Sequence, residues 1–321
     1  MKTVLVTSRS FSSGKVDVGE RLRLAGVTLI RRSPSHDLAE LRDCLPHVDG
    51  WIAGTGPITG EHFDLAPNLR VVARYGVGVD SVDLQAAHIR NIIVTNTPGA
   101  NTQAVADHTL ALLLSALRGV VAGDRRVRRG DWRVDQAREI STLRIGIVGV
   151  GRIGQAVAER LIGFGAVIYG LDPRLDQRQF ESMGILQGTD KIPGDVDVVT
   201  IHAPGNECLI DGDWISKCFP GLILINTARA SLVDESAIAG AIRSGRLGFY
   251  AADTIENENI SRESVLLSDD ISDRVIVTPH CAAQTIEAVD RMGSMAADSL
   301  LEVFSKRVPQ HALIIGGTNG N

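Results

Sequence analysis

Short runs of β-branched and other apolar residues alternate with helical patterns along the whole 321-residue chain. This alternation is typical of α/β proteins, because two parallel strands need a crossover segment between them, usually a helix. A chain of this length predicts about two domains of roughly 150 residues each. The pattern therefore predicts an α/β protein with two doubly wound parallel sheets.

The first strand series spans residues 1 to about 98. Its predicted strands are Val4–Thr7, Val27–Ile30, Trp51–Ala53, Val71–Ala73 and Ile92–Val94. One long helical stretch is expected to follow, from about Thr102 to Arg129. Its first half is almost wholly apolar, so we expect it to be buried against a sheet or against another subunit.

A second strand series begins at Arg144 and contains six predicted strands. They are Arg144–Val148, Val167–Tyr169, Val196–Ile201, Leu222–Asn226, Gly248–Ala252 and Val275–Thr278. Six strands with crossover helices are typical of a nucleotide-binding domain. The last helical pattern, about Thr285 to Phe304, is long enough to return to the first series. We therefore expect one discontinuous domain made of residues 1–98 and 286–321, a nucleotide-binding domain over residues 99–285, and a cleft between them.

Composition narrows the classes of partner. The net charge is −5, which argues against a nucleic-acid or anionic-membrane partner, since both need a basic face. No stretch approaches the ~20 apolar residues of a membrane span, and no signal peptide is visible. Four cysteines (Cys44, Cys208, Cys218 and Cys281) lie far apart and form no CxxC. We expect reduced thiols in a cytoplasmic protein, with no disulfide framework and no metal site.

A glycine motif, GxGxxG, occurs at Gly149, Gly151 and Gly154. The bare motif is weak in a chain with 33 glycines, but here an apolar strand precedes it and a helix-forming run follows it. In that context Gly149 permits a tight turn, Gly151 lets backbone amides approach a pyrophosphate, and Gly154 lets the helix pack on the strand. The helix N-terminus adds partial positive charge.

The next predicted strand leads to Asp172, 21 residues beyond Gly151. A carboxylate at this position accepts hydrogen bonds from a ribose 2′-OH and repels a 2′-phosphate, so we expect NAD rather than NADP. Arg174, two residues further on, is a weaker indication in the opposite direction.

Three candidate catalytic residues, Arg229, Glu258 and His280, follow predicted strands, whose carboxyl ends share one edge of the sheet. Arg229 can bind a substrate carboxylate with two hydrogen bonds and stabilise charge on a carbonyl oxygen. His280 can exchange a proton with the developing alkoxide, and Glu258 can orient the ring and favour its protonated form. Taken singly, each residue also fits an ordinary surface or structural role. Together they predict hydride transfer to a 2-oxo acid.

The motifs that carry these residues resemble the D-isomer-specific 2-hydroxyacid dehydrogenase family over nearly the whole chain. The matching segments are Arg74–Asp80 (RYGVGVD), Asn96–Thr102 (NTPGANT) with Val105–Asp107, Asn226–Arg229 (NTAR), Asp253 with Glu258 five residues later, and Thr278–His280 (TPH).

The resemblance implies a Rossmann domain inserted in a flavodoxin-like substrate domain, and a homodimer formed through the long helical region. It implies that Asp253 binds the nicotinamide carboxamide and that Arg152 and Ile153 lie on the pyrophosphate. Further cofactor contacts are implied at Ala203, Thr227, Ala228, Arg229, His280 and Ala283. The small-molecule acid substrate would be held by Thr55, Gly76, Val77, Gly78, Arg229 and His280.

The chain also departs from the family's pattern. Ala282-Ala283 replaces a glycine pair, and Asp253–Asn259 lacks the usual aromatic residue and proline, which leaves Glu256 as an alternative to Glu258. A basic residue that commonly holds a phosphorylated substrate appears as Ala53 or Gly54, which argues against phosphoglycerate. Two alternatives stay open: a phosphonate- or phosphite-type dehydrogenase, and an NAD(H)-sensing protein of the corepressor type.

Overall fold

The computed structural model describes residues 1–187, 196–256, 258 and 264–313. Its contacts divide the chain into two compact units. Unit 1 comprises Met1–Asn101 and Ala283–Asn321, and unit 2 comprises Thr102–Ala282. The boundaries expected from the sequence, 98/99 and 285/286, each differ from this division by three residues.

Unit 1 is built on one sheet whose strand order is β13-β5-β4-β3-β1-β2. Strands β1 to β5 are parallel, and only the edge strand β13 runs antiparallel, against β5. The parallel part has the 2-1-3-4-5 order of flavodoxin-like folds. The strands are β1 (Lys2–Val6), β2 (Val27–Arg31), β3 (Gly50–Ala53), β4 (Val71–Arg74), β5 (Ile93–Thr95) and β13 (Ala312–Leu313).

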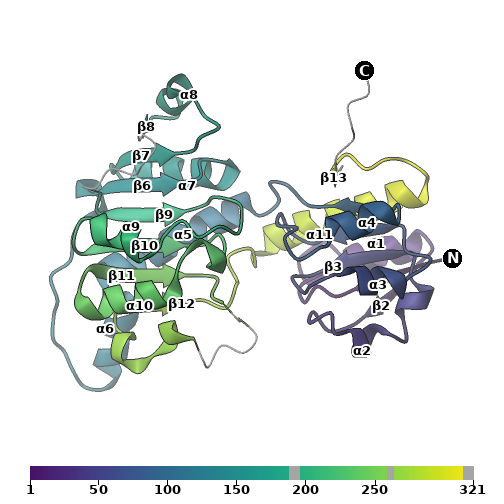
Figure 1. The fold of residues 1–321 in the computed structure, drawn as a ribbon, viewed down its shortest axis with the longest axis horizontal. Coiled ribbons are helices and arrows are strands. Elements are labelled where there is room, and N and C mark those ends of the chain that lie inside the picture. The colour runs from purple at the N-terminus through teal and green to yellow at the C-terminus, as the bar shows by residue number, and fades with distance from the viewer. Residues whose placement is uncertain (188–195, 257, 259–263, 314–321) are drawn as a thin grey trace. The chain divides into compact units, whose positions relative to one another are not determined.

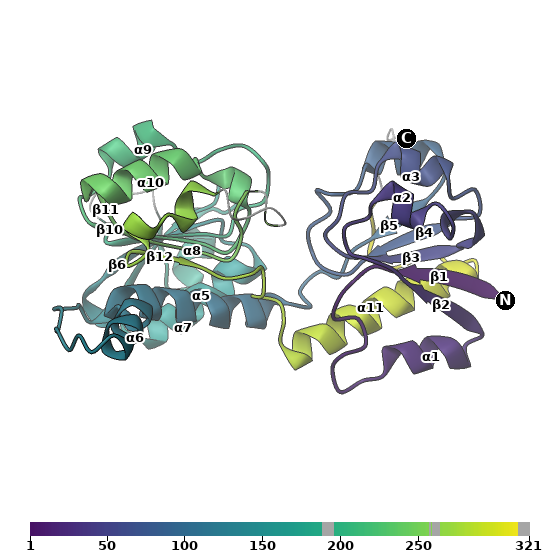
Figure 2. The ribbon, with the colours of Figure 1, turned by 90° about the horizontal axis from the view of Figure 1, so that it is seen from below.

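Helices cover both faces of this sheet, with α1 and α11 on one face and α2 and α3 on the other (Figure 2). Aspartates cap several of them: the side chains of Asp17, Asp37 and Asp83 accept hydrogen bonds from backbone amides in the first turns of α1, α2 and α4. The helices are α1 (Val18–Leu24), α2 (Leu38–Leu41), η1 (Leu45–His47), α3 (Gly60–Asp64), α4 (Leu84–Ile89) and α11 (Ile286–Phe304).

Unit 2 is built on a parallel sheet of seven strands, in the order β12-β11-β10-β9-β6-β7-β8 (Figure 1). Reading from β8 gives the 3-2-1-4-5-6 order of the Rossmann fold with one added strand. Chain order reverses between β6 and β9, and ligands of such sheets bind outside the carboxyl ends at that point. The strands are β6 (Arg144–Val148), β7 (Val167–Leu171), β8 (Leu186–Gln187), β9 (Val198–Ile201), β10 (Leu222–Asn226), β11 (Leu247–Ala252) and β12 (Val275–Val277).

The helices of unit 2 lie in two layers, with α5 and α7 on one face of the sheet and α9 and α10 on the other (Figure 2). The helical elements are α5 (Thr102–Arg118), α6 (Val120–Arg128), η2 (Ile140–Thr142), α7 (Arg152–Gly163), α8 (Gln177–Ser182), α9 (Gly212–Lys217), η3 (Ala230–Leu232), α10 (Glu235–Ser244), η5 (Val265–Leu267) and η6 (Asp269–Ile271).

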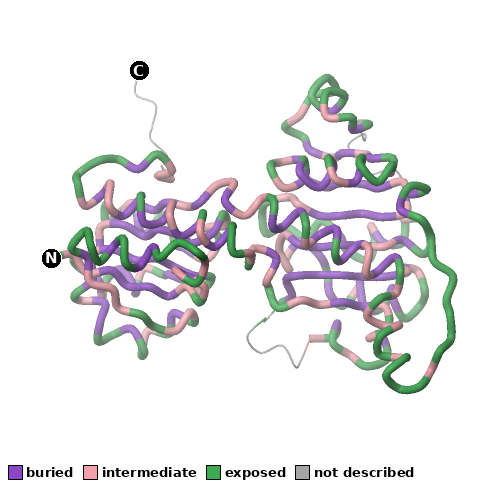
Figure 3. The backbone as a smooth tube through the Cα atoms, turned by 180° about the vertical axis from the view of Figure 1, so that it is seen from behind, coloured by how far each residue is buried: buried purple, intermediate pink, exposed green. Residues whose placement is uncertain are grey.

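Both faces of the unit 2 sheet are apolar. In β9, Val198 packs with the layer of α5 and α7, whereas Val199 and Ile201 pack with the layer of α9 and α10. A parallel sheet covered on both sides has no polar face, so its strands appear as continuous apolar runs, as the sequence pattern indicated. The strands are accordingly buried along most of their length (Figure 3).

These sheets confirm the predicted fold class, and two details of the prediction are wrong. The expected single helix from about Thr102 to Arg129 is two helices bent by 57°, because Gly119 adopts a left-handed conformation (φ 59°) that ends α5. The unit 2 sheet has seven strands rather than six, because β8 has only two residues and leaves no periodic signal in the sequence. The two-residue strand β13 of unit 1 was not predicted for the same reason. Among the described residues, no single helix is long and apolar enough to cross a membrane.

Candidate active site

The glycine motif forms the turn between β6 and α7. Gly149 has a φ of 85°, and a Cβ there would lie 2.5 Å from the backbone nitrogen of Ala203, which follows β9. A Cβ on Gly154 would lie 2.1 Å from the carbonyl oxygen of Gly149. A side chain at either position would clash with backbone atoms, because β6, β9 and α7 approach closely at the point where the strand order reverses.

Gly151 differs from the other two glycines. It is the N-cap of the 12-residue helix α7 and has an ordinary negative φ of −76°. A Cβ there would meet only the Nη2 atom of Arg174, at 3.9 Å. Packing within the protein therefore does not require glycine here. Open space in front of a helix N-terminus, where Arg152 and Ile153 form the first turn, suits a phosphate group.

Asp172 follows β7 and is buried. Its carboxylate accepts hydrogen bonds from the Val150 amide (3.0 Å) and from both Nε (2.9 Å) and Nη2 (2.8 Å) of Arg174. Hydrogen bonds from the Arg174 side chain hold the pKa of Asp172 below its ordinary value, although burial acts to raise it. Asp172 is thus an ionised acceptor beside the glycine turn. The largely exposed Arg174 side chain covers it.

Asp253 follows β11 and is a second buried carboxylate. It accepts hydrogen bonds from the amides of Cys281 (2.9 Å) and Ala282 (2.8 Å) and from the hydroxyl of Thr278 (2.6 Å). Burial acts to raise the pKa of Asp253, but hydrogen bonds from His108, Thr278 and the two amides bring it below its ordinary value.

Three further predicted residues, Arg229, Glu258 and His280, line one pocket of about 390 Å³ in unit 2. Both carboxylate oxygens of Glu258 lie 3.0 Å from Nδ1 of His280. His280 has a φ of 51°, which is unusual for a residue with a side chain. The remaining lining residues are Ala230, Ser231, Thr254 and Glu256.

Arg229 is placed by the turn after β10. The side chain of Asn226, which is fully buried, accepts a hydrogen bond from the Ala228 amide (3.0 Å) and donates one to the Arg229 carbonyl (2.8 Å). Thr227 is fixed by its hydroxyl, 2.9 Å from that of Thr109 in α5.

The two candidate acids differ in their contacts. Glu258 pairs with His280, whereas Glu256 lines the same pocket and donates its backbone amide to Glu235 (2.6 Å). Within the described part of the chain, Glu258 is the only carboxylate bonded to His280. Of the loop positions that depart from the family's pattern, Ile255 is buried in the core, and Asn257 and Asn259 lie outside the described residues.

The sequence prediction missed Glu235, the first residue of α10. Its buried carboxylate accepts hydrogen bonds from the Glu256 amide and from the Ser264 hydroxyl (3.0 Å), one on each side of Glu258 in the chain. Burial raises its pKa. An acidic residue at a helix start ordinarily indicates only a favourable helix dipole, so no sequence signal distinguished it.

The substrate residues predicted in unit 1 follow adjacent strands: Thr55 follows β3, and Gly76, Val77 and Gly78 follow β4. Thr55 and Val77 are exposed at this edge. Gly76 has a φ of 143°, so it requires glycine. Ala283, a predicted cofactor contact, is the first residue of the second segment of unit 1.

The strand order, the glycine turn and the carboxylate after β7 define a dinucleotide-binding α/β protein. Residues 110–282 match the family model described as "D-isomer specific 2-hydroxyacid dehydrogenase, NAD binding domain". The chain is 36% identical to a glyoxylate reductase of Korarchaeum cryptofilum, over 79% of each chain. It is 33% identical, over 99% of its length, to a D-3-phosphoglycerate dehydrogenase of Mycobacterium tuberculosis, and spans 60% of that relative.

A solved structure agrees with these matches. An NAD-dependent formate dehydrogenase of Staphylococcus aureus in complex with NAD superposes with a TM-score of 0.85 at 30% identity, covering 99% of this chain and 100% of that one. The chain belongs to the D-isomer specific 2-hydroxyacid dehydrogenase family, and residues 110–282 are its NAD-binding domain. The predicted family and the predicted cofactor, NAD, are thereby confirmed.

Asp172 and Arg174 generate a prediction about cofactor choice. Asp172→Ala would remove the carboxylate expected to accept the ribose hydroxyl and would free the Arg174 guanidinium for a 2′-phosphate. Hydrogen bonds to a charged group contribute about 1.5–3 kcal/mol, so we expect NADH to bind roughly 10–100-fold more weakly and NADPH to bind more tightly.

Dissociation constants for both cofactors, measured by nucleotide fluorescence, check this expectation. The double variant Asp172→Ala/Arg174→Ala is the control, and it should lose NADH affinity without gaining NADPH affinity. Wild-type protein that binds NADPH as tightly as NADH would contradict the role given to Asp172.

Proposed function

We propose that this protein is an NAD-dependent dehydrogenase that interconverts a small 2-oxo acid and the corresponding D-2-hydroxy acid. The observation that carries the proposal is the pocket in which Arg229 accompanies a histidine already paired with a carboxylate. The chain spans only part of the phosphoglycerate dehydrogenases it matches, so its activity rests on this site rather than on their names.

The residues would divide the chemistry between them. Bound NADH supplies the hydride that reduces the carbonyl carbon. Arg229 would hold the substrate carboxylate with a planar pair of donors. Because Nδ1 of His280 is engaged by Glu258, Nε2 is the ring atom that would give a proton to the carbonyl oxygen in reduction and take it back in oxidation.

Glu258 would fix the orientation of the imidazole and stabilise its protonated form. The His280 and Glu258 side chains are 41% and 35% exposed, so water reaches the pair in the protein alone. A substrate in the pocket would reduce that exposure and strengthen the electrostatic contribution of both groups.

The proposed cofactor contacts follow from the same placement. The glycine turn would hold the pyrophosphate, Asp172 the ribose, and Asp253 the carboxamide of the nicotinamide. The full proposed set is Gly149, Gly151, Arg152, Ile153, Gly154, Asp172, Ala203, Thr227, Ala228, Arg229, Asp253, His280 and Ala283. For the substrate we add Thr55, Gly76, Val77 and Gly78 of unit 1.

The edge of unit 1 supports a substrate without a phosphate group. Ala53 is fully buried in β3, and a Cβ on Gly54 would lie 2.6 Å from the carbonyl oxygen of Thr7. No basic side chain can therefore occupy position 54 without moving the backbone. We also propose a homodimer, as the family resemblance implies, in the cytoplasm and with no nucleic-acid or membrane partner, as the composition indicates.

A panel of 2-oxo acids with NADH tests the proposal. Glyoxylate, pyruvate, hydroxypyruvate and phosphonate analogues of pyruvate are compared by loss of NADH absorbance. Arg229→Lys keeps the charge but loses the planar fork, so we expect kcat/KM to fall about 100-fold or more with an unchanged NADH dissociation constant. NADH binding without turnover of any acid would instead identify a nucleotide sensor.

The identity of the acid beside His280 gives a second prediction. Glu258→Gln keeps the shape but removes the charge that pairs with Nδ1 of His280, so reductive kcat should fall roughly 10–100-fold, the size expected for losing a hydrogen bond to a charged group, about 1.5–3 kcal/mol. Glu256→Gln is the matched control in the same pocket and should change kcat by less than about threefold, within the error of such comparisons. A larger loss from Glu256→Gln than from Glu258→Gln would exchange the two roles.

Glu235 is a positioning residue in this scheme, because it fastens the chain on both sides of Glu258. Glu235→Ala removes both acceptor oxygens and leaves the Glu256 amide and the Ser264 hydroxyl without this partner, which costs about 1–3 kcal/mol at a buried site. We expect kcat to fall at least about tenfold with little change in NADH affinity.

Two comparisons separate this role from a general loss of stability. Ser264→Ala removes one of the two bonds and should have a smaller effect on kcat. In a Glu258→Gln background, Glu235→Ala should lower kcat little further, since the group it positions is already disabled. Fully additive losses would show that Glu235 acts elsewhere.

A further inference from the structure

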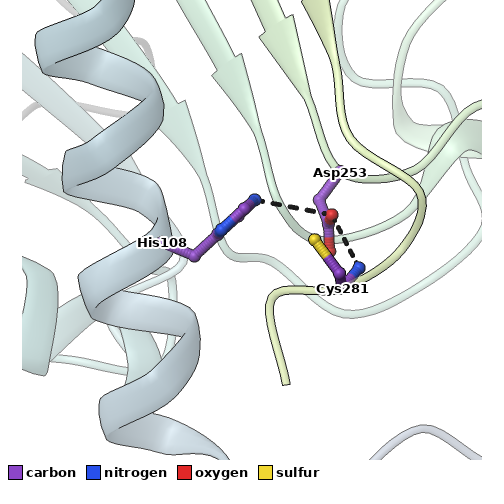
Figure 4. Close-up of side chains that lie close together, drawn as sticks. All are labelled: His108, Asp253 and Cys281. Carbon is purple, nitrogen blue, oxygen red and sulfur yellow. Dashed lines mark hydrogen bonds and ion pairs between the residues drawn. The ribbon is translucent and has the colours of Figure 1, made fainter. Parts of the chain in front are cut away.

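Three side chains capable of binding a metal ion meet beside the proposed nicotinamide end of the site. His108 projects from α5, Asp253 follows β11, and Cys281 follows His280 after β12 (Figure 4). One ring nitrogen of His108, one carboxylate oxygen of Asp253 and the sulfur of Cys281 all lie within 4.8 Å of one another.

The spacing is close to that of a zinc site. Zinc bonds of about 2.0–2.3 Å in a tetrahedron place ligand atoms roughly 3.3–3.8 Å apart. The three atoms would have to approach one another by up to about 1.5 Å, which side-chain rotations can supply. A nitrogen, an oxygen and a sulfur donor together are typical of zinc, whereas the thiolate disfavours magnesium and calcium.

The surrounding hydrogen bonds already hold the central ligand. The Cys281 and Ala282 amides fix the Asp253 carboxylate, and outer contacts of this kind orient ligands and strengthen metal binding. The Thr278 hydroxyl donates to Asp253, so it accepts the hydrogen bond from Nε2 of His108 (2.9 Å). Binding a metal through Nε2 would move that ring proton to Nδ1 and leave the imidazole neutral.

Charge and access also suit a divalent cation. The Asp253 side chain is 2% exposed and that of His108 is 20% exposed, so the cluster is buried at one end and reachable from the other. A Cys281 thiolate and the Asp253 carboxylate carry two negative charges, which neutralise a 2+ ion in this low-dielectric place.

We propose that His108, Asp253 and Cys281 form a binding site for one Zn²⁺ ion, with the fourth position open to water. Binding forms the Zn–S bond and releases the thiol proton to solvent. The sequence spacing indicated no metal site because the three ligands come from positions 108, 253 and 281, and only the sheet edge and α5 bring them together.

The site would regulate the enzyme, an extension that rests on the proposed function. Asp253 is the group proposed to bind the nicotinamide carboxamide, and a zinc ion on its carboxylate would occupy that place. Zinc and NADH would therefore exclude each other, and zinc inhibition would be competitive with NADH.

Cobalt binding tests the site without any assay of activity. Zn²⁺ is spectroscopically silent, but tetrahedral Co²⁺ has strong visible bands, and a bound thiolate adds a charge-transfer band in the near ultraviolet. We expect one equivalent of Co²⁺ to give both features in the wild-type protein and Zn²⁺ to abolish them. Cys281→Ser should remove the charge-transfer band, and His108→Gln should weaken Co²⁺ binding by at least about 10–100-fold, the cost of even an outer-shell change.

Cys208→Ser is the matched control, since Cys208 is an exposed cysteine far from the cluster in sequence, and it should keep both bands. The proposal fails if saturating Co²⁺ gives no thiolate band, or if the band survives in Cys281→Ser. NADH added to the Co²⁺-loaded protein should abolish the bands as it binds; NADH fluorescence showing binding with the bands intact would overturn the exclusion. The cobalt spectrum does not depend on turnover. A protein that reduces no 2-oxo acid but still gives the thiolate band would overturn the proposed function and leave the metal site standing.

Discussion

The hydrogen bonds accepted by the buried Asp253 carboxylate fix the chain segment that carries His280 in unit 2. They come from the Thr278 hydroxyl and from the Cys281 and Ala282 amides, on either side of His280. A left-handed φ at a residue with a side chain costs of order 1 kcal/mol or more, and it persists only where the surroundings enforce it. The bonds to Asp253 favour this backbone conformation at His280. The position of the imidazole therefore depends on the neighbouring backbone as well as on its contact with Glu258.

The same device recurs at the other carboxylates. Asp172 ties the turn after β6 to the end of β7 through the Val150 amide, and Glu235 ties the segment before Glu258 to Ser264. Each carboxylate is buried and satisfied by donors from a neighbouring segment, so its charge stabilises a loop rather than the core. Loops placed in this way keep their side chains near the geometry that the proposed hydride transfer requires, which matters because small displacements reduce rates strongly.

The sequence predicts those strands, helices and site residues that leave a local pattern, and it does not predict contacts between distant residues. Arg144–Val148 and Leu222–Asn226 are predicted with their observed ends, because a polar residue or a glycine bounds each apolar run. These residues are Arg144 and Gly149 for the first strand, and Gly221 and Asn226 for the second. Gly119 was not predicted to break the long helix, since a glycine inside a helical pattern is often tolerated. Glu235 and His108 could not be found from spacing, because their partners lie at least 21 residues away and meet them only through the sheet. His108 directly follows the Val105–Asp107 motif in the sequence, but nothing in that motif indicates a partner for it.

The departures from the family's pattern lie next to these anchors, and the anchors explain why the chain tolerates them. Ala282 replaces a glycine, yet what Asp253 binds is its backbone amide, which any residue other than proline supplies. Ile255 takes the place of an aromatic residue but remains buried in the core. Cys281 likewise offers its amide to Asp253 whatever its side chain, so this contact constrains the backbone here and leaves the side chain free to vary. A thiol can therefore stand beside His108 and Asp253 without disturbing His280, because Asp253 holds the segment around His280 through the main-chain amides of Cys281 and Ala282 and needs nothing of the Cys281 side chain.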